Sequence, residues 1–147
     1  MKRILFSLLL LCALTAARAA RLDTLAIRTF LLESPDEGLE IVPDSIESGK
    51  RLPVVYLLHG HGGAPRHWID VTQPRLPELA QQYGMIFVLP DGHNSWYFDS
   101  PVDDKMQMET FITDELVNYI DKNYPTIADA RHRAVTGLSM GGHGSLY

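Results

Sequence analysis

Cysteine is almost absent from this sequence of 147 residues: its single example is Cys12, near the N-terminus. One cysteine cannot form an intramolecular disulfide, so the sequence is not that of a disulfide-stabilised scaffold. Basic residues are also few and scattered, since 13 Lys and Arg stand against 18 Asp and Glu, giving a net charge of −5. Without a basic block, the sequence gives no support for nucleic-acid binding.

Long apolar runs are lacking as well, and the longest lies near the N-terminus. Residues 4–14 are apolar apart from Ser7 and Cys12, follow a basic pair at positions 2 and 3, and precede Ala17-Arg18-Ala19. This arrangement predicts a signal peptide over residues 1–19 and a secreted or periplasmic protein. A buried N-terminal helix is the alternative, which the polar sequence that follows disfavours. The run is too short to span a bilayer, and Leu11 before Cys12 argues against lipidation, so no stable membrane anchor is expected after signal removal.

Two segments after the signal favour an antiparallel entry into a sheet. Thr24 to Leu32 alternates and is rich in strand-forming residues, and Leu39 to Val42 could pair with it as a short second strand. The polar stretch from Ser45 to Arg51 contains a glycine and predicts a surface turn. No chemistry is indicated in this part of the chain.

From Pro53 onward, apolar runs alternate with helical patterns. Val54–Leu58 is a continuous apolar run, as expected of a strand buried on both faces of a parallel sheet. Ile86–Leu89 and Arg133–Gly137 are predicted to be further strands. Apolar residues recur at helical spacing between these strands, at Leu76, Leu79, Ala80 and Tyr83 and again at Met108, Ile112, Leu116, Tyr119 and Ile120. The pattern predicts an α/β fold, with a mostly parallel sheet and helices on both faces.

The third strand leads directly into a Gly-x-Ser-x-Gly sequence, Gly137 to Gly141. In a strand–turn–helix context this motif presents a nucleophilic serine on a sharp turn, with glycines where the chains approach too closely for side chains. Ser139 is therefore a candidate nucleophile, and the N–H of Met140 is a candidate donor to an oxyanion. The alternative interpretation is a glycine-rich turn with a capping serine.

A second glycine-rich motif, His59-Gly60-His61-Gly62-Gly63, follows the first buried strand. In acyl-transfer enzymes of this plan such a loop supplies a second oxyanion donor, and we assign that donor to the N–H of His61. Two alternatives remain open. The histidines could be structural, or His59 and His61 could bind zinc together with His93 or Asp91.

Several separated stretches carry a resemblance to the esterase D-like esterases of the α/β-hydrolase fold. These stretches are Pro53–Gly63 with Trp68, Val88–Tyr97, Glu109–Tyr124 and Arg133–Leu146. The family includes tributyrin-type carboxylesterases, S-formylglutathione hydrolases, feruloyl and acetylxylan esterases, and mycolyltransferases. The resemblance implies a serine carboxylic-ester hydrolase that acts through an acyl-enzyme on Ser139, with no metal and no cofactor.

The resemblance also implies residues that bind a small-molecule ester. Asn94, Trp96 and Tyr97 are expected to line the mouth of the site, and Trp68 could stack on a sugar or flank a short acyl chain. Aromatic packing is the alternative role of the rings. Asp91 is interpreted as a turn residue rather than as the triad acid.

The family places its catalytic Asp and His after the nucleophile, and none of the six histidines present is a good substitute. His143, for example, is expected to pack or to lie at the surface. We therefore expect residues 20–147 to be the N-terminal portion of a single domain, truncated after the nucleophile elbow. Such a fragment should be inactive and leave its last strand as an exposed edge. An acyltransferase and a non-catalytic binding module are the alternative functions.

Overall fold

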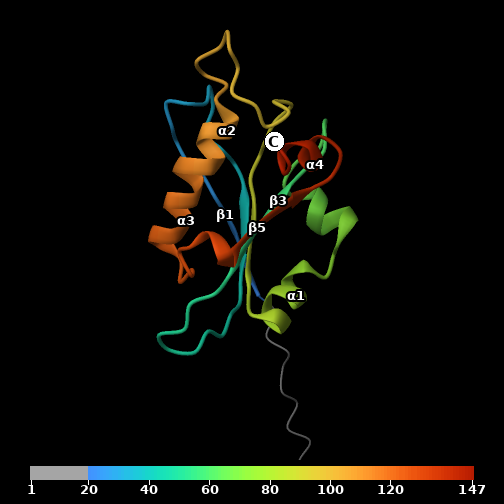
Figure 1. Cartoon of the computed structure of the whole chain (residues 1–147). Helices are drawn as coiled ribbons and strands as arrows, with labels where there is room; N and C mark the ends of the chain where they lie inside the picture. Colours follow the sequence, from blue (N-terminus) through green and yellow to red (C-terminus); the bar gives the residue numbers. More distant parts are fainter. Residues whose placement is uncertain (1–19) are drawn as a thin grey trace, which may run out of the picture.

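A five-stranded sheet forms the centre of the protein, for which a computed structural model describes residues 20–147 (Figure 1). The predicted signal peptide lies outside the described residues. The strands are β1 (Arg21–Thr24), β2 (Leu39–Val42), β3 (Val54–Leu58), β4 (Ile86–Leu89) and β5 (Arg133–Gly137). Their order across the sheet is β1-β2-β4-β3-β5. The strands predicted over 39–42, 54–58, 86–89 and 133–137 are therefore confirmed.

The sheet is mixed. β3 pairs in parallel with β4 on one side and with β5 on the other, so that Val54 lies beside both Ile86 and Arg133. β1 pairs antiparallel with β2, and β2 antiparallel with β4. The predicted parallel arrangement thus holds for β4, β3 and β5, and the antiparallel entry holds for β1 and β2.

The apolar run of β3 is explained by a hydrophobic core on each face of the sheet. Val54, Tyr56 and Leu58 belong to one buried cluster, and Leu57 belongs to the other. Successive side chains of a strand point to opposite faces, so a strand with two covered faces needs apolar residues at every position.

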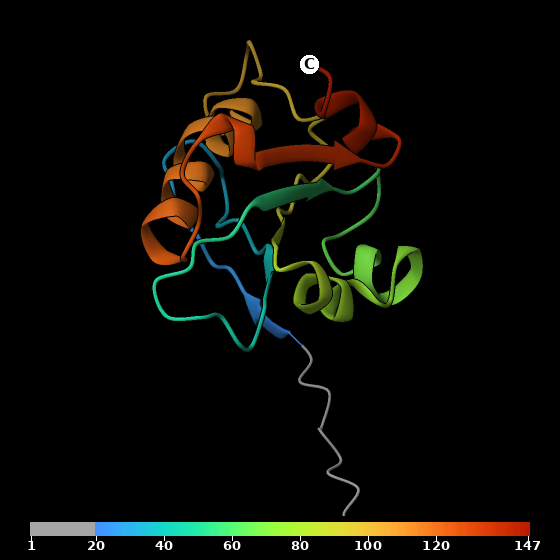
Figure 2. The ribbon, with the colours of Figure 1, turned by 60° about the horizontal axis from the view of Figure 1, so that its bottom comes forward.

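Helices cover both faces, and Figure 2 shows the sheet between them. On one face, η1 (Trp68–Thr72) leads into α1 (Leu76–Tyr83), which ends as predicted at Gly84, a left-handed residue with φ 61°. On the other face, α2 (Met108–Thr110), η2 (Phe111–Leu116) and α3 (Val117–Asn123) follow one another without a break. Two short helices complete the fold, η3 (Ala130–His132) and α4 (Met140–Gly144).

The long helical segment buries the stripe that its spacing predicts, with one exception. Met108, Leu116 and Ile120 are fully buried, whereas Tyr119 is 38% exposed and does not belong to the core. None of the helices in residues 20–147 is long and apolar enough to cross a membrane.

The predicted strand over 24–32 is wrong in its bounds. Regular pairing with β2 covers only Arg21–Thr24, and beyond it the chain makes the isolated bridge between Ile27 and Asp36. The opposing segment carries Pro35, which has no N–H to donate, and so a regular ladder cannot continue there. Alternation still identified the inward side chains at the start of this segment, because Leu25 and Ile27 are buried.

The last strand of the described sheet, β5, is bonded to β3 alone and is partly open to solvent. Val135 at its centre is 46% exposed. The predicted exposed edge is therefore present in the described residues.

Replacing Leu116 by alanine should destabilise the fold strongly. Leu116 is fully buried between the helix and the sheet, so truncation leaves a cavity and should lower the free energy of unfolding by about 3 kcal/mol. Val102→Ala is the control, because Val102 is 93% exposed and its loss should change stability by less than about 0.5 kcal/mol. Urea unfolding measures both, and equal effects would contradict this account of the core.

Candidate active site

Ser139 lies on a sharp turn between β5 and α4. Its backbone angles are φ 51° and ψ −111°, outside the regions that a residue with a side chain ordinarily adopts. Such strain persists only where the surrounding structure enforces it, and it is typical of functional sites. The side chain is exposed. The strand–turn–helix context predicted for the Gly-x-Ser-x-Gly motif is therefore present.

The two elbow glycines are required by close packing of backbones. A Cβ atom at Gly137 would lie 2.3 Å from the carbonyl carbon of Gly141. A Cβ atom at Gly141 would lie 2.2 Å from the carbonyl oxygen of Leu58, at the end of β3. Both distances are far below van der Waals contact, so no side chain fits at either position.

The loop His59–Gly63, here called the oxyanion loop, runs beside the elbow. A Cβ atom at Gly60 would lie 3.6 Å from the Cβ of Ser139 and 3.3 Å from the carbonyl oxygen of Leu138. Gly62 has φ 70° and open space around it, a conformation that favours glycine. The fold thus brings together two motifs that are far apart in the sequence.

The N–H groups of the two candidate oxyanion donors are unpaired among the described residues. Within residues 20–147, neither the N–H of His61 nor that of Met140 donates a hydrogen bond to another residue. Backbone N–H groups are normally paired when they are buried, and unpaired ones beside a nucleophile are the usual donors to an oxyanion.

A third loop, residues 91–97, lies against the oxyanion loop. The side-chain oxygen of Asn94 accepts a hydrogen bond from the N–H of Gly62 at 2.7 Å. Trp96 is 46% exposed, and its ring centroid lies 6.4 Å from that of His61. Asn94 and Trp96, two of the three residues expected at the mouth, are therefore next to the oxyanion loop, and Asn94 uses its oxygen to hold that loop.

Tyr97 does not line the mouth of the site, contrary to the prediction. It is only 3% exposed, and its hydroxyl donates to the carbonyl oxygen of His59 at 3.2 Å. Its side chain fills the space beside Gly92 and Gly144. A Cβ atom at Gly92 would lie 2.3 Å from a ring carbon of Tyr97, and one at Gly144 would lie 2.5 Å from the Tyr97 Cβ. Burial raises the pKa of the Tyr97 hydroxyl. The backbone is left-handed at both Trp96 and Tyr97, which turns one ring outward and the next inward.

Trp68 takes part in packing within the protein. Trp68 belongs to η1 and packs against the buried cluster under α1, which includes Leu57 and Phe87. Its indole nitrogen is buried and has no hydrogen-bond partner among the described residues. The ring is therefore part of the packing on that face, the alternative that sequence reasoning held open.

His143 packs in an aromatic cluster, as expected. Its ring centroid lies 5.7 Å from that of Trp96, 4.9 Å from that of Phe98 and 5.9 Å from that of Tyr147. Its Nδ1 atom is buried and unpaired among the described residues.

The geometry does not favour the zinc interpretation. Both ring nitrogens of His59 take part in hydrogen bonds within the protein, and the His61 ring lies by Trp96. Within residues 20–147, no group of three or more His, Cys, Asp or Glu side chains is placed to hold a metal ion.

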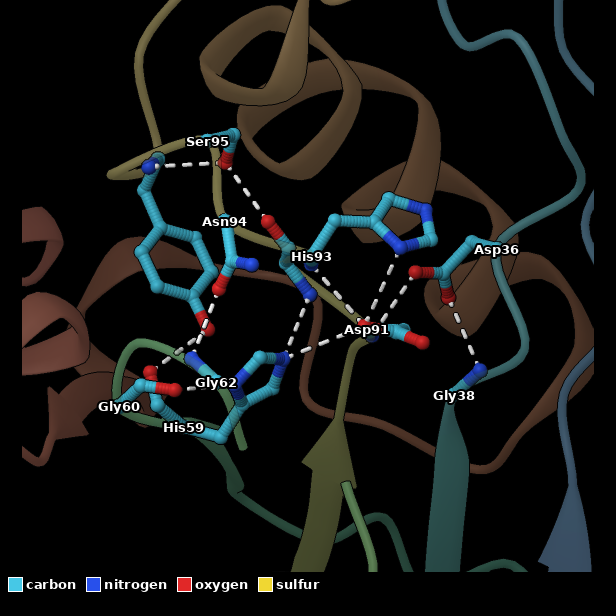
Figure 3. A network of polar contacts seen from close by, with 11 residues as sticks. Asp36, Gly38, His59, Gly60, Gly62, Asp91, His93, Asn94 and Ser95 are labelled. Carbon is cyan, nitrogen blue, oxygen red and sulfur yellow. Dashed lines mark hydrogen bonds and ion pairs between the residues drawn. The ribbon is translucent and has the colours of Figure 1, made fainter. Parts of the chain in front are cut away.

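Sequence reasoning missed Asp36, whose fully buried carboxylate lies beside Asp91 (Figure 3). Its Oδ1 accepts a hydrogen bond from the N–H of Asp91 at 2.9 Å, and its Oδ2 accepts one from the N–H of Gly38 at 3.2 Å. Burial, together with the nearby Asp91 carboxylate, raises the pKa of Asp36 to about 7. Nothing in the polar segment around it distinguished Asp36 from a surface residue.

Asp91 has a turn role, as expected, and a second role besides. Its Oδ1 accepts a hydrogen bond from the N–H of His93 at 2.9 Å and lies 3.2 Å from Nε2 of His59. Burial works to raise the pKa of Asp91, but the contact with His59 and the bond from His93 hold it below its usual value. Asp36, Asp91 and His59 thus form one chain of polar contacts that ends at the oxyanion loop (Figure 3).

The comparisons with known proteins agree with this geometry. A solved ferulic acid esterase is 32% identical in sequence and superposes with a TM-score of 0.73 over 86% of this chain and 51% of its own. The fold is therefore that of the α/β-hydrolase class. Residues 36–147 match the family model Esterase, described as "Putative esterase". The chain belongs to this esterase family.

Two curated relatives show how much of a family member this chain represents. An esterase of Mycobacterium tuberculosis is 34% identical over 110 residues, which are 72% of this chain and 24% of the relative. An acetyl esterase of Caldicellulosiruptor saccharolyticus is 29% identical over 124 residues, which are 84% of this chain and 44% of the relative. The chain therefore spans less than half the length of these two relatives.

Replacing Asp36 by asparagine should change how stability depends on pH. The pKa of Asp36 is about 7 in the folded protein and 3.8 in an ordinary aspartate. Because the folded protein therefore holds the proton more tightly than the unfolded chain, the contribution of Asp36 to stability falls as pH rises from about 4 to about 7. Asp36→Asn releases no proton and retains an acceptor oxygen. Its free energy of unfolding should rise relative to that of the unmodified protein by up to about 4 kcal/mol between pH 4 and 8. Denaturant titrations across this range measure the difference, and a constant difference would refute the assignment.

Replacing Gly141 by alanine should disrupt the elbow. The new methyl group would overlap the backbone of β3, and we expect a loss of about 3 kcal/mol or more in the free energy of unfolding. The neighbouring Gly142→Ala is the matched control, because its Cβ would lie 3.3 Å from the nearest atom, the carbonyl oxygen of Gly137. Its effect should stay below about 1 kcal/mol. Similar losses in the two variants would contradict the packing described for the elbow.

Proposed function

We propose that the protein is a secreted or periplasmic serine carboxylic-ester hydrolase. The observation that carries the proposal is the strained Ser139 elbow, which lies beside a glycine-rich loop and has two unpaired backbone N–H groups near it. Membership of the esterase family supports the reaction class. Export rests on the signal sequence expected over residues 1–19.

The proposed reaction is a two-step acyl transfer. The hydroxyl oxygen of Ser139 attacks the ester carbonyl while a base takes its proton, and the alcohol leaves to give an acyl-enzyme. Water then attacks the acyl carbonyl, which releases the acid and restores the serine. In both steps the N–H groups of His61 and Met140 stabilise the negative oxygen, and each donor contributes about 3 kcal/mol.

The base that this reaction needs is the histidine that the family resemblance places after the nucleophile. Within residues 20–147, no histidine ring is hydrogen-bonded to Ser139. His59 is occupied by loop contacts, and His143 packs among aromatic rings. These contacts argue against either His59 or His143 as the base.

Short acyl esters and carbohydrate-linked esters are the proposed substrates. Among the similar proteins, one is named an acetyl esterase and another a ferulic acid esterase. The half-exposed ring of Trp96 beside the oxyanion loop offers an apolar surface for a small acyl group or a sugar face.

A fluorophosphonate probe should label the full-length protein at Ser139. Ser139→Ala should abolish both the labelling and the hydrolysis of short-chain aryl esters, because the nucleophile is lost. Ser48→Ala, at an exposed serine, is the matched control and should retain both. Mass spectrometry of the labelled peptide and a spectrophotometric ester assay measure these outcomes.

The same assay separates the serine mechanism from a metal mechanism. EDTA should leave hydrolysis intact. If EDTA inactivates the protein while Ser139→Ala remains active, the proposed function is wrong and metal-assisted hydrolysis takes its place.

A further inference from the structure

The buried imidazole of His59 touches the peptide that carries a candidate oxyanion donor. His59 is 1% exposed, and its Nδ1 lies 2.8 Å from the carbonyl oxygen of Gly60. The same oxygen accepts a second hydrogen bond, from the N–H of Gly63 at 2.9 Å. Two donors therefore hold the carbonyl end of the Gly60–His61 peptide.

Holding that carbonyl also aims the N–H of His61. A peptide unit is planar and trans, so its C=O and N–H bonds point in opposite directions within one rigid plane. Once the Gly60 oxygen is directed toward His59 and Gly63, the His61 hydrogen must point away from them. The glycine on either side of His61 would otherwise leave this peptide free to rotate.

The far edge of the ring is held by the 91–97 loop. Nε2 of His59 lies 3.0 Å from the N–H nitrogen of Gly92 and 3.2 Å from Oδ1 of Asp91. Asp91 is in turn held by its N–H bond to the buried carboxylate of Asp36. Figure 3 shows the resulting chain of contacts, which runs from Asp36 to Gly60.

We propose that His59 is a positioning residue that orients the Gly60–His61 peptide, so that the His61 N–H is ready to bind the oxyanion. The inference rests on the proposed function and assigns to the first histidine of the glycine-rich motif a role in it. His59 itself does not touch the substrate. It acts through the peptide that does.

The hydrogen bonds of His59 determine which ring nitrogen carries a hydrogen. Nδ1 faces an acceptor, the Gly60 oxygen, and so must carry a hydrogen. In the neutral ring Nε2 is then an acceptor for the Gly92 N–H. In the protonated ring Nε2 donates to Asp91 instead. The nearby charged or titratable groups include Asp91, Asp36, Tyr97, whose ring packs edge-on against that of His59, and His93, whose Nδ1 lies 3.5 Å from the Asp91 carboxylate. The bond to Gly60 survives in both protonation states.

Two substitutions separate positioning from general stability. The side-chain nitrogen of His59→Asn falls near Nδ1 and can still donate to Gly60, whereas that of His59→Gln falls near Nε2 and cannot. We expect kcat of His59→Asn to stay within about tenfold of the unmodified full-length protein. For His59→Gln we expect a fall of about 100-fold with KM nearly unchanged, the size of a lost oxyanion donor.

Both variants remove the same buried ring, so thermal unfolding should shift them alike and control for folding. Equal kcat values in the two variants at equal folded fraction would overturn the proposal.

A second readout does not depend on activity: the ¹H–¹⁵N NMR correlations of the His59 ring in the unmodified protein. A hydrogen on Nδ1 at high pH supports the proposal, and a neutral ring protonated on Nε2 overturns it. If ester hydrolysis proves independent of Ser139, the proposed function fails while this NMR result still decides how the ring holds Gly60.

Discussion

The contact between backbones at the nucleophile elbow is the constraint on which the rest of the site depends. α4 begins directly after Ser139 and lies so close to β3 and β5 that only glycine fits at positions 137 and 141. This closeness forces the left-handed backbone of Ser139 and exposes its side chain. It also brings the end of β3, and with it the oxyanion loop, next to the serine.

The oxyanion loop needs a second kind of support, because glycines leave its peptides free to turn. The 91–97 loop supplies that support through Asn94, which holds Gly62, and through Asp91, which faces His59. Asp36 anchors the backbone of Asp91 and is itself buried near the Asp91 carboxylate, an arrangement that costs stability near neutral pH. A buried group that costs stability but holds the loop supporting the oxyanion loop is consistent with preorganisation of the site.

Sequence patterns predicted the central strands, the main helices and the elbow, because each has a local cause. The run in β3 reflects burial on two faces, and Gly137 and Gly141 reflect close chain approach. Side-chain direction in the 91–97 loop could not be predicted, since it depends on left-handed residues whose conformation is imposed by packing around Tyr97. Asp36 was missed because its partner, Asp91, is 55 residues away in the sequence, and only the tertiary fold brings the two together.

The central claim is that Ser139 and the two N–H groups act on one reacting centre. A crystal structure of the full-length protein after reaction with a fluorophosphonate tests it most directly. We predict that the phosphorus is bonded to the Ser139 oxygen and that one phosphoryl oxygen lies about 3 Å from both the His61 and the Met140 nitrogen. An adduct on another residue, or a phosphoryl oxygen that contacts neither nitrogen, would contradict the account.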